Sequence, residues 1–202
     1  MSNDKFDEEK LKIILVGESG VGKTNLINVS TGGYFNEDEE STLSSSYQPK
    51  KIEINGNTYN LSIWDTIGQE KLRNLTKLFF KNSKIAILVY DITNKKSFKE
   101  LGFWYNSLNE MVKEDVVLGV VGNKQDLYQK EEVSEEDGEN YARSIKAKFK
   151  LTSAKEDPEG FNNFLKELLT DYINNNHEVG EKNIVINNKK HINKTGKKKC
   201  NC

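Results

Sequence analysis

The chain has 202 residues and a formal net charge of −1, with 30 lysines and arginines against 31 acidic residues. This length fits one domain with an appendage, and the near-neutral charge opposes a nucleic-acid binder, which uses a basic surface to displace counterions. The longest apolar runs, residues 13–16 and 85–90, are too short to span a membrane. The only two cysteines stand at the C-terminus, which excludes a disulfide framework in the body.

From Lys12 onward, short apolar runs alternate with longer amphipathic segments, a pattern that predicts an α/β protein. Asn55 and Gly56 favour a tight hairpin between two antiparallel strands, because both residue types accept positive φ angles. Pro49 cannot donate to a strand ladder and so predicts that the hairpin begins on a sheet edge. The expected strands are 12–16, 51–55, 58–64, 85–90, 116–121 and 148–152, and the expected helices are 21–30, 97–112, 134–147 and 158–172.

Helix-start signals and a change of composition divide the chain. Ser134, with Asp137 three residues later, approximates a capping box, and Pro158 fits a first helical turn. From residue 174 the chain is rich in Asn and Lys without a sustained period, which predicts a disordered basic tail. We therefore expect a short acidic N-terminal extension over 1–10, one globular domain over 11–173 and a tail over 174–202.

Residues 17–24 read GESGVGKT, which fits the phosphate-binding pattern G-x-x-x-x-G-K-[ST] and lies between an apolar strand and a helix. Glycines let the backbone wrap a phosphate chain so that its N–H groups point at the anion. Lys23 would reach the β- and γ-phosphates, and the Thr24 hydroxyl would bind Mg²⁺. The predicted phosphate-binding residues of this loop are Ser19, Gly20, Val21, Gly22, Lys23 and Thr24.

Three further segments follow apolar strands in the order that a guanine-nucleotide site requires. In DTIGQE, Asp65 would hold Mg²⁺ through water and the Gly68 N–H would meet a γ-phosphate. In NKQD, the Asp126 carboxylate matches two adjacent N–H donors of guanine that adenine lacks. Ser153, Ala154 and Lys155 would present backbone N–H groups to the guanine oxygen. Each of these segments alone is more often a polar loop, but their order after strands favours a nucleotide site.

Together these residues resemble the small GTPases of the Ras superfamily, and within them the Rab family, over residues 10–172. The resemblance includes Trp64-Asp65-Thr66, Tyr90-Asp91 within VYDIT and Trp104, besides the motifs above. It implies a P-loop GTPase fold with a six-stranded mixed sheet, five strands parallel and one antiparallel edge strand, flanked by helices. It also implies a slow, activator-dependent enzyme that hydrolyses GTP to GDP and works as a switch in vesicle traffic.

Carried onto matching positions, the resemblance assigns further roles. Phe35 would lie edge-on to the guanine, beside Asn123, Lys124 and Asp126, and Thr42 would join Mg²⁺ and the γ-phosphate in the GTP state. Gln69 would orient the attacking water. The effector-binding aromatic residues would be Tyr47, Trp64 and Phe79, for which core packing is the alternative, and for Trp104 we expect core packing.

Two departures from the family pattern bear on function. The family's usual Thr-x-Gly segment reads Thr42-Leu43-Ser44 here. The sequence therefore does not identify which effectors the chain binds. Ile67 replaces a small residue before Gly68 and would slow hydrolysis if its bulk disturbs that loop. The alternatives are therefore a scaffold that holds GTP with little hydrolysis, and a P-loop ATPase or kinase, which NKQD opposes.

The chain ends in Cys200-Asn201-Cys202, which resembles the Rab C-x-C ending and implies geranylgeranylation of both cysteines. Two lipid chains beside lysines would form a stable anchor on an anionic cytoplasmic leaflet. The resemblance implies a monomer on the cytoplasmic face of endomembranes that cycles through the cytosol. Its implied partners are GTP, GDP, effectors, an exchange factor, a GTPase-activating protein, a GDP-dissociation inhibitor and a prenylation escort protein.

Overall fold

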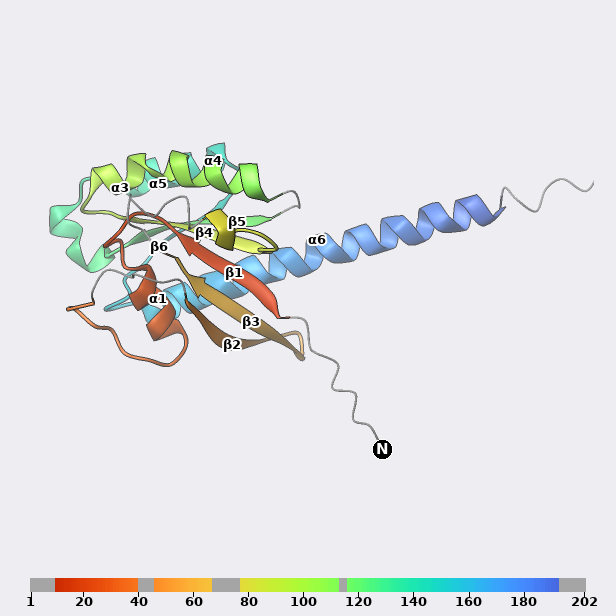
Figure 1. Ribbon diagram of the computed structural model, residues 1–202, viewed down its shortest axis with the longest axis horizontal. Helices are drawn as coiled ribbons and strands as arrows, with labels where there is room; N and C mark the ends of the chain where they lie inside the picture. The colour runs from red at the N-terminus through yellow and green to blue at the C-terminus, as the bar shows by residue number, and fades with distance from the viewer. Residues whose placement is uncertain (1–9, 40–45, 67–76, 113–115, 193–202) are drawn as a thin grey trace, which may run out of the picture.

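The computed structural model describes residues 10–39, 46–66, 77–112 and 116–192, with side chains described no further than Asn176. Its centre is a six-stranded sheet in the order β2-β3-β1-β4-β5-β6 (Figure 1). Only β2 is antiparallel to its neighbour, β3, while the other pairs are parallel. The expected mixed sheet with one antiparallel edge strand is therefore confirmed. The strands are β1 (Leu11–Val16), β2 (Ser46–Ile54), β3 (Asn57–Asp65), β4 (Ile85–Asp91), β5 (Val117–Asn123) and β6 (Lys148–Leu151).

The hairpin of β2 and β3 turns at Asn55 and Gly56, whose φ angles are 52° and 77°. These positive values confirm the tight turn expected from the Asn-Gly pair. Strand β2 begins at Ser46, whereas the expected start was residue 51. Pro49 therefore lies inside the strand, opposite Ser62. The edge position explains the difference, because only one side of β2 has a neighbouring strand and a proline is tolerated there.

Helices cover both faces of the sheet. Helices α1 (Lys23–Ser30) and α6 (Pro158–Ile192) lie on one face (Figure 1). Helices α3 (Lys95–Lys99), α4 (Leu101–Met111) and α5 (Glu135–Ser144) lie on the other. The expected helix 97–112 is thus two consecutive helices that meet at Glu100. Ser134 caps α5 by accepting the Asp137 N–H, which confirms that helix start.

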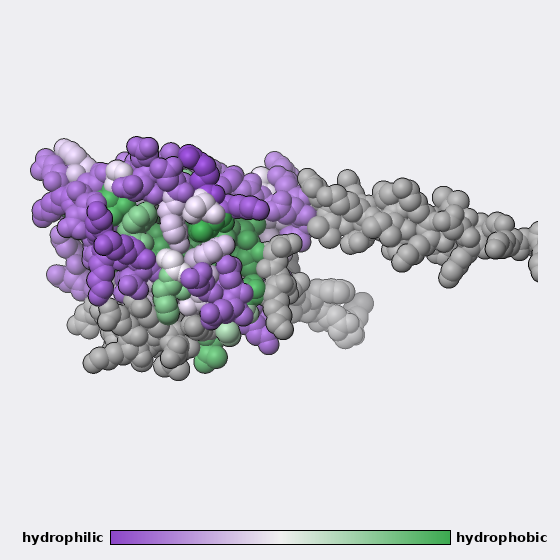
Figure 2. Space-filling view, turned by 90° about the horizontal axis from the view of Figure 1, so that it is seen from above, coloured by the Kyte–Doolittle hydropathy of each residue, from purple (hydrophilic) through white to green (hydrophobic). Residues whose placement is uncertain are grey.

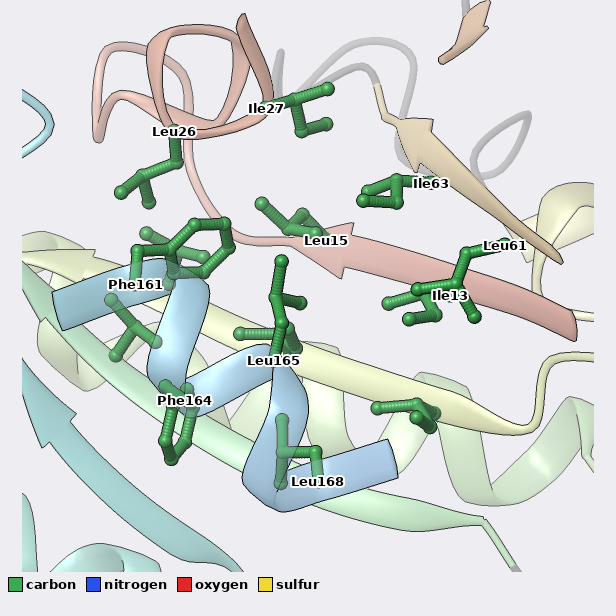
Figure 3. Packing of buried hydrophobic residues seen from close by; sticks show 14 of the residues in the cluster. Ile13, Leu15, Leu26, Ile27, Leu61, Ile63, Phe161, Phe164, Leu165 and Leu168 are labelled. Carbon is green, nitrogen blue, oxygen red and sulfur yellow. The ribbon is translucent and has the colours of Figure 1, made fainter. Parts of the chain in front are cut away.

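Two hydrophobic clusters fill the space between the sheet and its helices. Ile13 and Leu15 of β1 pack with residues of α1 and α6, including Leu26, Phe161 and Leu165 (Figure 3). Their neighbours Ile14 and Val16 join the opposite cluster, with Trp104 and Leu108 among its members. None of these four residues of β1 has any exposed surface. Because β1 is buried on both faces, it reads as a continuous apolar run rather than an alternating one.

Helix α6 continues to Ile192, past the expected end at residue 172, and in Figure 1 its distal part extends beyond the sheet. Its contacts with the core come from the first turns, where Phe161, Phe164, Leu165, Leu168 and Leu169 are buried. The domain boundary near residue 173 and the expected tail remain predictions. Among the residues that the structure describes, no helix combines the length and the apolar character needed to cross a membrane.

Candidate functional site

A cavity of about 280 Å³ opens where the loops after β1, β5 and β6 come together. The carboxyl ends of parallel strands meet at one edge of a sheet, so loops distant in sequence become neighbours there. Most of the predicted nucleotide-binding residues line this cavity: Ser19, Gly20, Gly22, Lys23, Thr24, Phe35, Asn123, Lys124, Asp126, Ala154 and Lys155. The expected grouping of phosphate and base segments at one place therefore exists in the fold.

The loop between β1 and α1 depends on glycines at its tightest points. Gly17 and Gly22 have φ angles of 152° and 93°, which L-residues with side chains rarely adopt. A Cβ on Gly17 would lie 2.2 Å from the carbonyl oxygen of Val89, and one on Gly22 would lie 2.3 Å from Asn123 Nδ2. The two glycines therefore let the loop pack directly against the ends of β4 and β5.

Lys23 is the first residue of α1 and is only 5% exposed. Its Nζ donates to the carbonyl oxygens of Gly17 and Glu18 at 2.9 and 2.8 Å. Burial lowers the pKa of Lys23 to about 8, and the nearby carboxylates of Asp65 and Glu18 oppose that shift. The ammonium is thus held inside the loop, at a helix N-terminus, where an anion is stabilised.

Thr24 and Asp65 bring two hard oxygen ligands together. Thr24 Oγ1 donates to Asp65 Oδ2 at 2.7 Å, and Asp65 is 5% exposed at the end of β3. The next residue, Thr66, fixes the strand end by donating from Oγ1 to the carbonyl oxygen of Leu15 at 2.6 Å. A hydroxyl and a carboxylate beside a phosphate site suit Mg²⁺, which keeps several waters and takes few protein ligands. Within the described ranges, no group of three or more His, Cys, Asp or Glu side chains could hold a metal ion by itself.

Asn123 joins the phosphate loop to the base loops. Its Nδ2 donates to the carbonyl oxygen of Val21 at 2.8 Å, and its Oδ1 accepts the Ala154 N–H at 3.1 Å. The side chain is 1% exposed, so both bonds are shielded from water. Val21 does not line the cavity, but through this bond it fixes the position of Asn123.

Asp126 is oriented by a side chain from the loop after β6. Ser153 Oγ donates to Asp126 Oδ1 at 2.6 Å and accepts the backbone N–H groups of Lys155 and Glu156. Ser153 itself is buried and lies behind the cavity wall. The carboxylate of Asp126 is thereby held at the cavity, on a 3₁₀ helix over Gln125–Lys130 that the sequence did not predict.

Two lysines border the same end of the cavity. Lys124 has a φ angle of 67°, and its Nζ lies 2.7 Å from Asp91 Oδ2. Lys155 Nζ lies 5.8 Å from the centroid of the Phe35 ring and 3.7 Å from Glu37 Oε1. Phe35 and Lys155 therefore form one side of the opening.

Several residues that line the cavity were not predicted from the sequence: Asn25, Asn36, Glu37, Glu39 and Leu127. Asn25 directly follows the phosphate motif and is 7% exposed, which is unusual for an asparagine in a helix. Its position next to Thr24 was the only available signal. The others stand in loops that carry no motif of their own.

The three predicted effector-binding aromatic residues form one row. The ring centroids of Tyr47 and Trp64 are 5.3 Å apart, and those of Trp64 and Phe79 are 5.8 Å apart. Tyr47 is 47% exposed, and Lys12 Nζ lies 4.6 Å from the Trp64 ring centroid. In the space-filling view, hydrophobic residues reach the surface between mainly hydrophilic ones (Figure 2).

Trp104 combines core packing with a polar contact. It has no exposed surface and belongs to the cluster under α4, as expected. Its Nε1 also donates to Glu18 Oε1 at 3.0 Å, and Glu18 belongs to the phosphate loop. Helix α4 therefore supports that loop from the opposite face of the sheet.

Several predicted residues lie outside the described part of the chain. They are Thr42, Ser44, Ile67, Gly68, Gln69, Cys200 and Cys202. Their roles rest on the sequence alone.

Comparisons with known proteins agree with this geometry. The model of the Ras family matches residues 12–175. The chain is 41% identical to Ras-related protein Rab-21 of Bos taurus over 160 residues, which cover 79% of this chain and 70% of that protein. It is 42% identical to Rab-21 of Geodia cydonium over 147 residues, 73% and 64% of the two chains. It is 38% identical to Rab-11C of Dictyostelium discoideum over 171 residues, 85% and 76% of the two.

The family match spans the sheet, the phosphate loop and both base loops. Members of the family bind GTP and GDP and act with regulators and effectors. The chain therefore belongs to the Ras family and is a Rab-like small GTPase, an enzyme that hydrolyses GTP in membrane trafficking.

Proposed function

We propose that the cavity binds GTP or GDP with Mg²⁺, with one group of the residues described above contacting the phosphates and another contacting the base. The observation that carries the proposal is the double hydrogen bond of Asn123, which joins the phosphate loop to the base loops around one cavity. A phosphate site and a base site fixed by one side chain suit a single ligand that has both groups.

The phosphate end of the proposed site uses the backbone N–H groups of residues 19–24 and the Lys23 ammonium. Buried charge close to an anion acts in a low dielectric, where its attraction is stronger than in water. Thr24 and Asp65 would hold Mg²⁺, joined by Thr42 in the GTP state. The metal, when bound, neutralises charge on the phosphate oxygens.

The base end uses Asp126, held by Ser153, to accept hydrogen bonds from guanine. Ala154 and Lys155 border the same space, and Phe35 would lie against the edge of the base. A carboxylate matches two neighbouring donors, so a base without them leaves it unsatisfied. This arrangement would select guanine over adenine.

Switching would use the loops that contain Thr42 and Gly68, which close on a γ-phosphate and relax after hydrolysis. Gln69 would orient the attacking water, with an intrinsic rate on the order of 10⁻⁴ to 10⁻³ s⁻¹ until an activating protein adds transition-state charge. The aromatic row of Tyr47, Trp64 and Phe79 would contact effectors in the GTP state.

Membrane attachment would come from geranylgeranyl groups on Cys200 and Cys202, with the neighbouring lysines on an anionic leaflet. This supports a place on the cytoplasmic face of endomembranes, with return to the cytosol bound to a GDP-dissociation inhibitor. An escort protein for prenylation and an exchange factor complete the proposed cycle of a monomeric switch.

Base selectivity tests the proposed site most directly. An asparagine at position 126 offers one donor and one acceptor, which suit xanthine better than guanine. We expect Asp126→Asn to weaken GDP binding by several kcal/mol and to improve binding of the xanthine nucleotide, measured by competition against a fluorescent nucleotide. The matched control is Asp171→Asn, because Asp171 is a half-buried acid of α6 that pairs with Lys148 at the start of β6 and does not line the cavity. If Asp126→Asn retained wild-type affinity for GDP, the base assignment would be wrong.

A further inference from the structure

A pair of asparagines fastens the loop after α1 to the helix that begins at the phosphate site. Asn25 Nδ2 donates to the carbonyl oxygen of Asn36 at 2.8 Å, and the Asn36 N–H donates to Asn25 Oδ1 at 2.8 Å. The Asn25 side chain thus bonds the backbone of Asn36 in both directions. The carboxamide of asparagine supplies the donor and the acceptor of this pair on one planar group.

The segment held by Asn25 has its own local order. Asn36 Oδ1 accepts the Asp38 N–H at 3.1 Å, which forms a turn, and Asn36 Nδ2 donates to Glu39 Oε2 at 3.3 Å. Glu37 reaches across to Lys155 on the base side. These contacts are exposed, whereas Asn25 is 7% exposed, so the buried amide is the firmest attachment of the segment.

Phe35 directly precedes Asn36 in the chain. Its ring lines the cavity and packs against the core cluster of α1 and α6. Asn25 directly follows Thr24, so the same helical turn that faces the phosphates also holds the peptide next to this ring. Fixing the Asn36 backbone on both its N–H and its carbonyl leaves the Phe35 backbone little freedom to swing away.

We propose that Asn25 is a positioning residue that holds Phe35 against bound guanine and thereby sets the rate at which the nucleotide dissociates. The inference rests on the proposed function of the cavity as a guanine-nucleotide site. Nucleotide can leave only when the ring moves aside, and the ring moves aside only when the two bonds of Asn25 open. The Asn25 amide is engaged with the Asn36 backbone rather than with the base loops, so we expect it to act on dissociation and not on base choice.

The expected size follows from the two hydrogen bonds. Two bonds of the usual net strength correspond to about a 10- to 30-fold change in rate when both are lost. The full chain is loaded with fluorescent GDP and chased with excess unlabelled GDP, with Mg²⁺ present. We expect Asn25→Ala to release the nucleotide about 10- to 30-fold faster than wild type. Ser30→Ala is the matched control, because it removes a buried side-chain bond within the same helix and should leave the rate unchanged.

Two further variants separate positioning from general loosening of the helix. In a Phe35→Ala background the added Asn25→Ala change should accelerate release less than about twofold, since there is no ring left to hold. Asn36→Ala keeps the backbone groups that Asn25 binds, so its effect should be well below that of Asn25→Ala. Asn25→Leu, which is close to asparagine in size but makes neither bond, should be at least several-fold faster and provides a test if the alanine variant does not fold.

Two results would overturn the inference: release from Asn25→Ala and Asn25→Leu within twofold of wild type, or equal acceleration by Asn25→Ala with and without the Phe35 ring. Failure of the proposed function looks different, because the wild-type chain would then not retain GDP in preference to ADP. Base preference of Asn25→Ala should match wild type, which a damaged base site would not allow.

Discussion

Nucleotide binding should take up a proton at mildly alkaline pH, because of Lys23. Burial lowers the pKa of its ammonium from 10.5 to about 8. A polyphosphate bound beside Nζ stabilises the charged form and raises that pKa again. The protein without nucleotide therefore loses the proton as the pH rises through 8, while the complex keeps it. Binding then includes proton uptake, and affinity falls with rising pH.

The magnitude follows from the pKa alone. At pH 8.5 about three quarters of the Lys23 side chains would be neutral before binding, against about one tenth at pH 7, so GDP affinity should fall about fourfold over that interval. This interval stays below the range in which guanine itself loses its N1 proton. Calorimetric titration of nucleotide-free protein in two buffers with different ionisation enthalpies measures the protons taken up.

We expect uptake of about 0.7 to 0.8 proton at pH 8.5 and about 0.1 at pH 7. Lys12→Gln is the matched control, because burial lowers the pKa of Lys12 as well, yet Lys12 lies on β1 and does not line the cavity. That variant should retain the full uptake. An uptake of about 0.2 proton or less at pH 8.5 would show that Lys23 stays charged before binding and would refute the reasoning.

Three other predictions concern single substitutions. Asn123→Ala removes two buried hydrogen bonds and should lower the free energy of unfolding by about 2 to 4 kcal/mol. Urea unfolding at a fixed GDP concentration measures this loss, and a loss under about 1 kcal/mol would contradict the bridging role of Asn123. Gly138→Ala would place a Cβ 2.5 Å from Tyr90 Oη. Overpacking should outweigh the better helix propensity of alanine and lower the thermal midpoint of unfolding. An unchanged midpoint would be inconsistent with this packing. Ile67→Ala should raise single-turnover GTP hydrolysis several-fold at unchanged affinity if the isoleucine restrains the loop of Gly68, whereas equal rates would leave an ordinary hydrolysis cycle.

The nucleotide motifs were predictable because their signals are local. Gly17, Gly22, Lys23 and Thr24 stand within eight residues, and each motif follows an apolar strand that the sequence marks clearly. The order of the strands in the sheet then brings the motifs to one edge. The hairpin turn was predictable for the same reason, since Asn55 and Gly56 are adjacent.

Contacts between distant segments were not predictable from a single sequence. The Trp104 contact with Glu18 joins residues 86 positions apart, and the hydrophobic pattern of α4 only indicates burial. The two bonds between Asn25 and Asn36 depend on the path of a loop that has no motif. The early start of β2 was hidden by Pro49, whose effect on a strand depends on whether a second neighbour is present.

The placement of the β2–β3 hairpin at one edge of the sheet affects which substitutions the chain can accept. The cavity lies where the loops after β1, β5 and β6 meet, whereas Tyr47 and Trp64 lie on β2 and β3 at the other side of the sheet. Strand β2 has a neighbour on one side only, so its outward-facing residues can vary without disturbing the ladder of the inner strands. A chain of this design can accept new side chains along one margin of the sheet while the residues around the cavity keep their positions. If the aromatic row contacts effectors as proposed, exchange of the exposed residues of β2 between relatives should transfer partner choice without rebuilding the cavity.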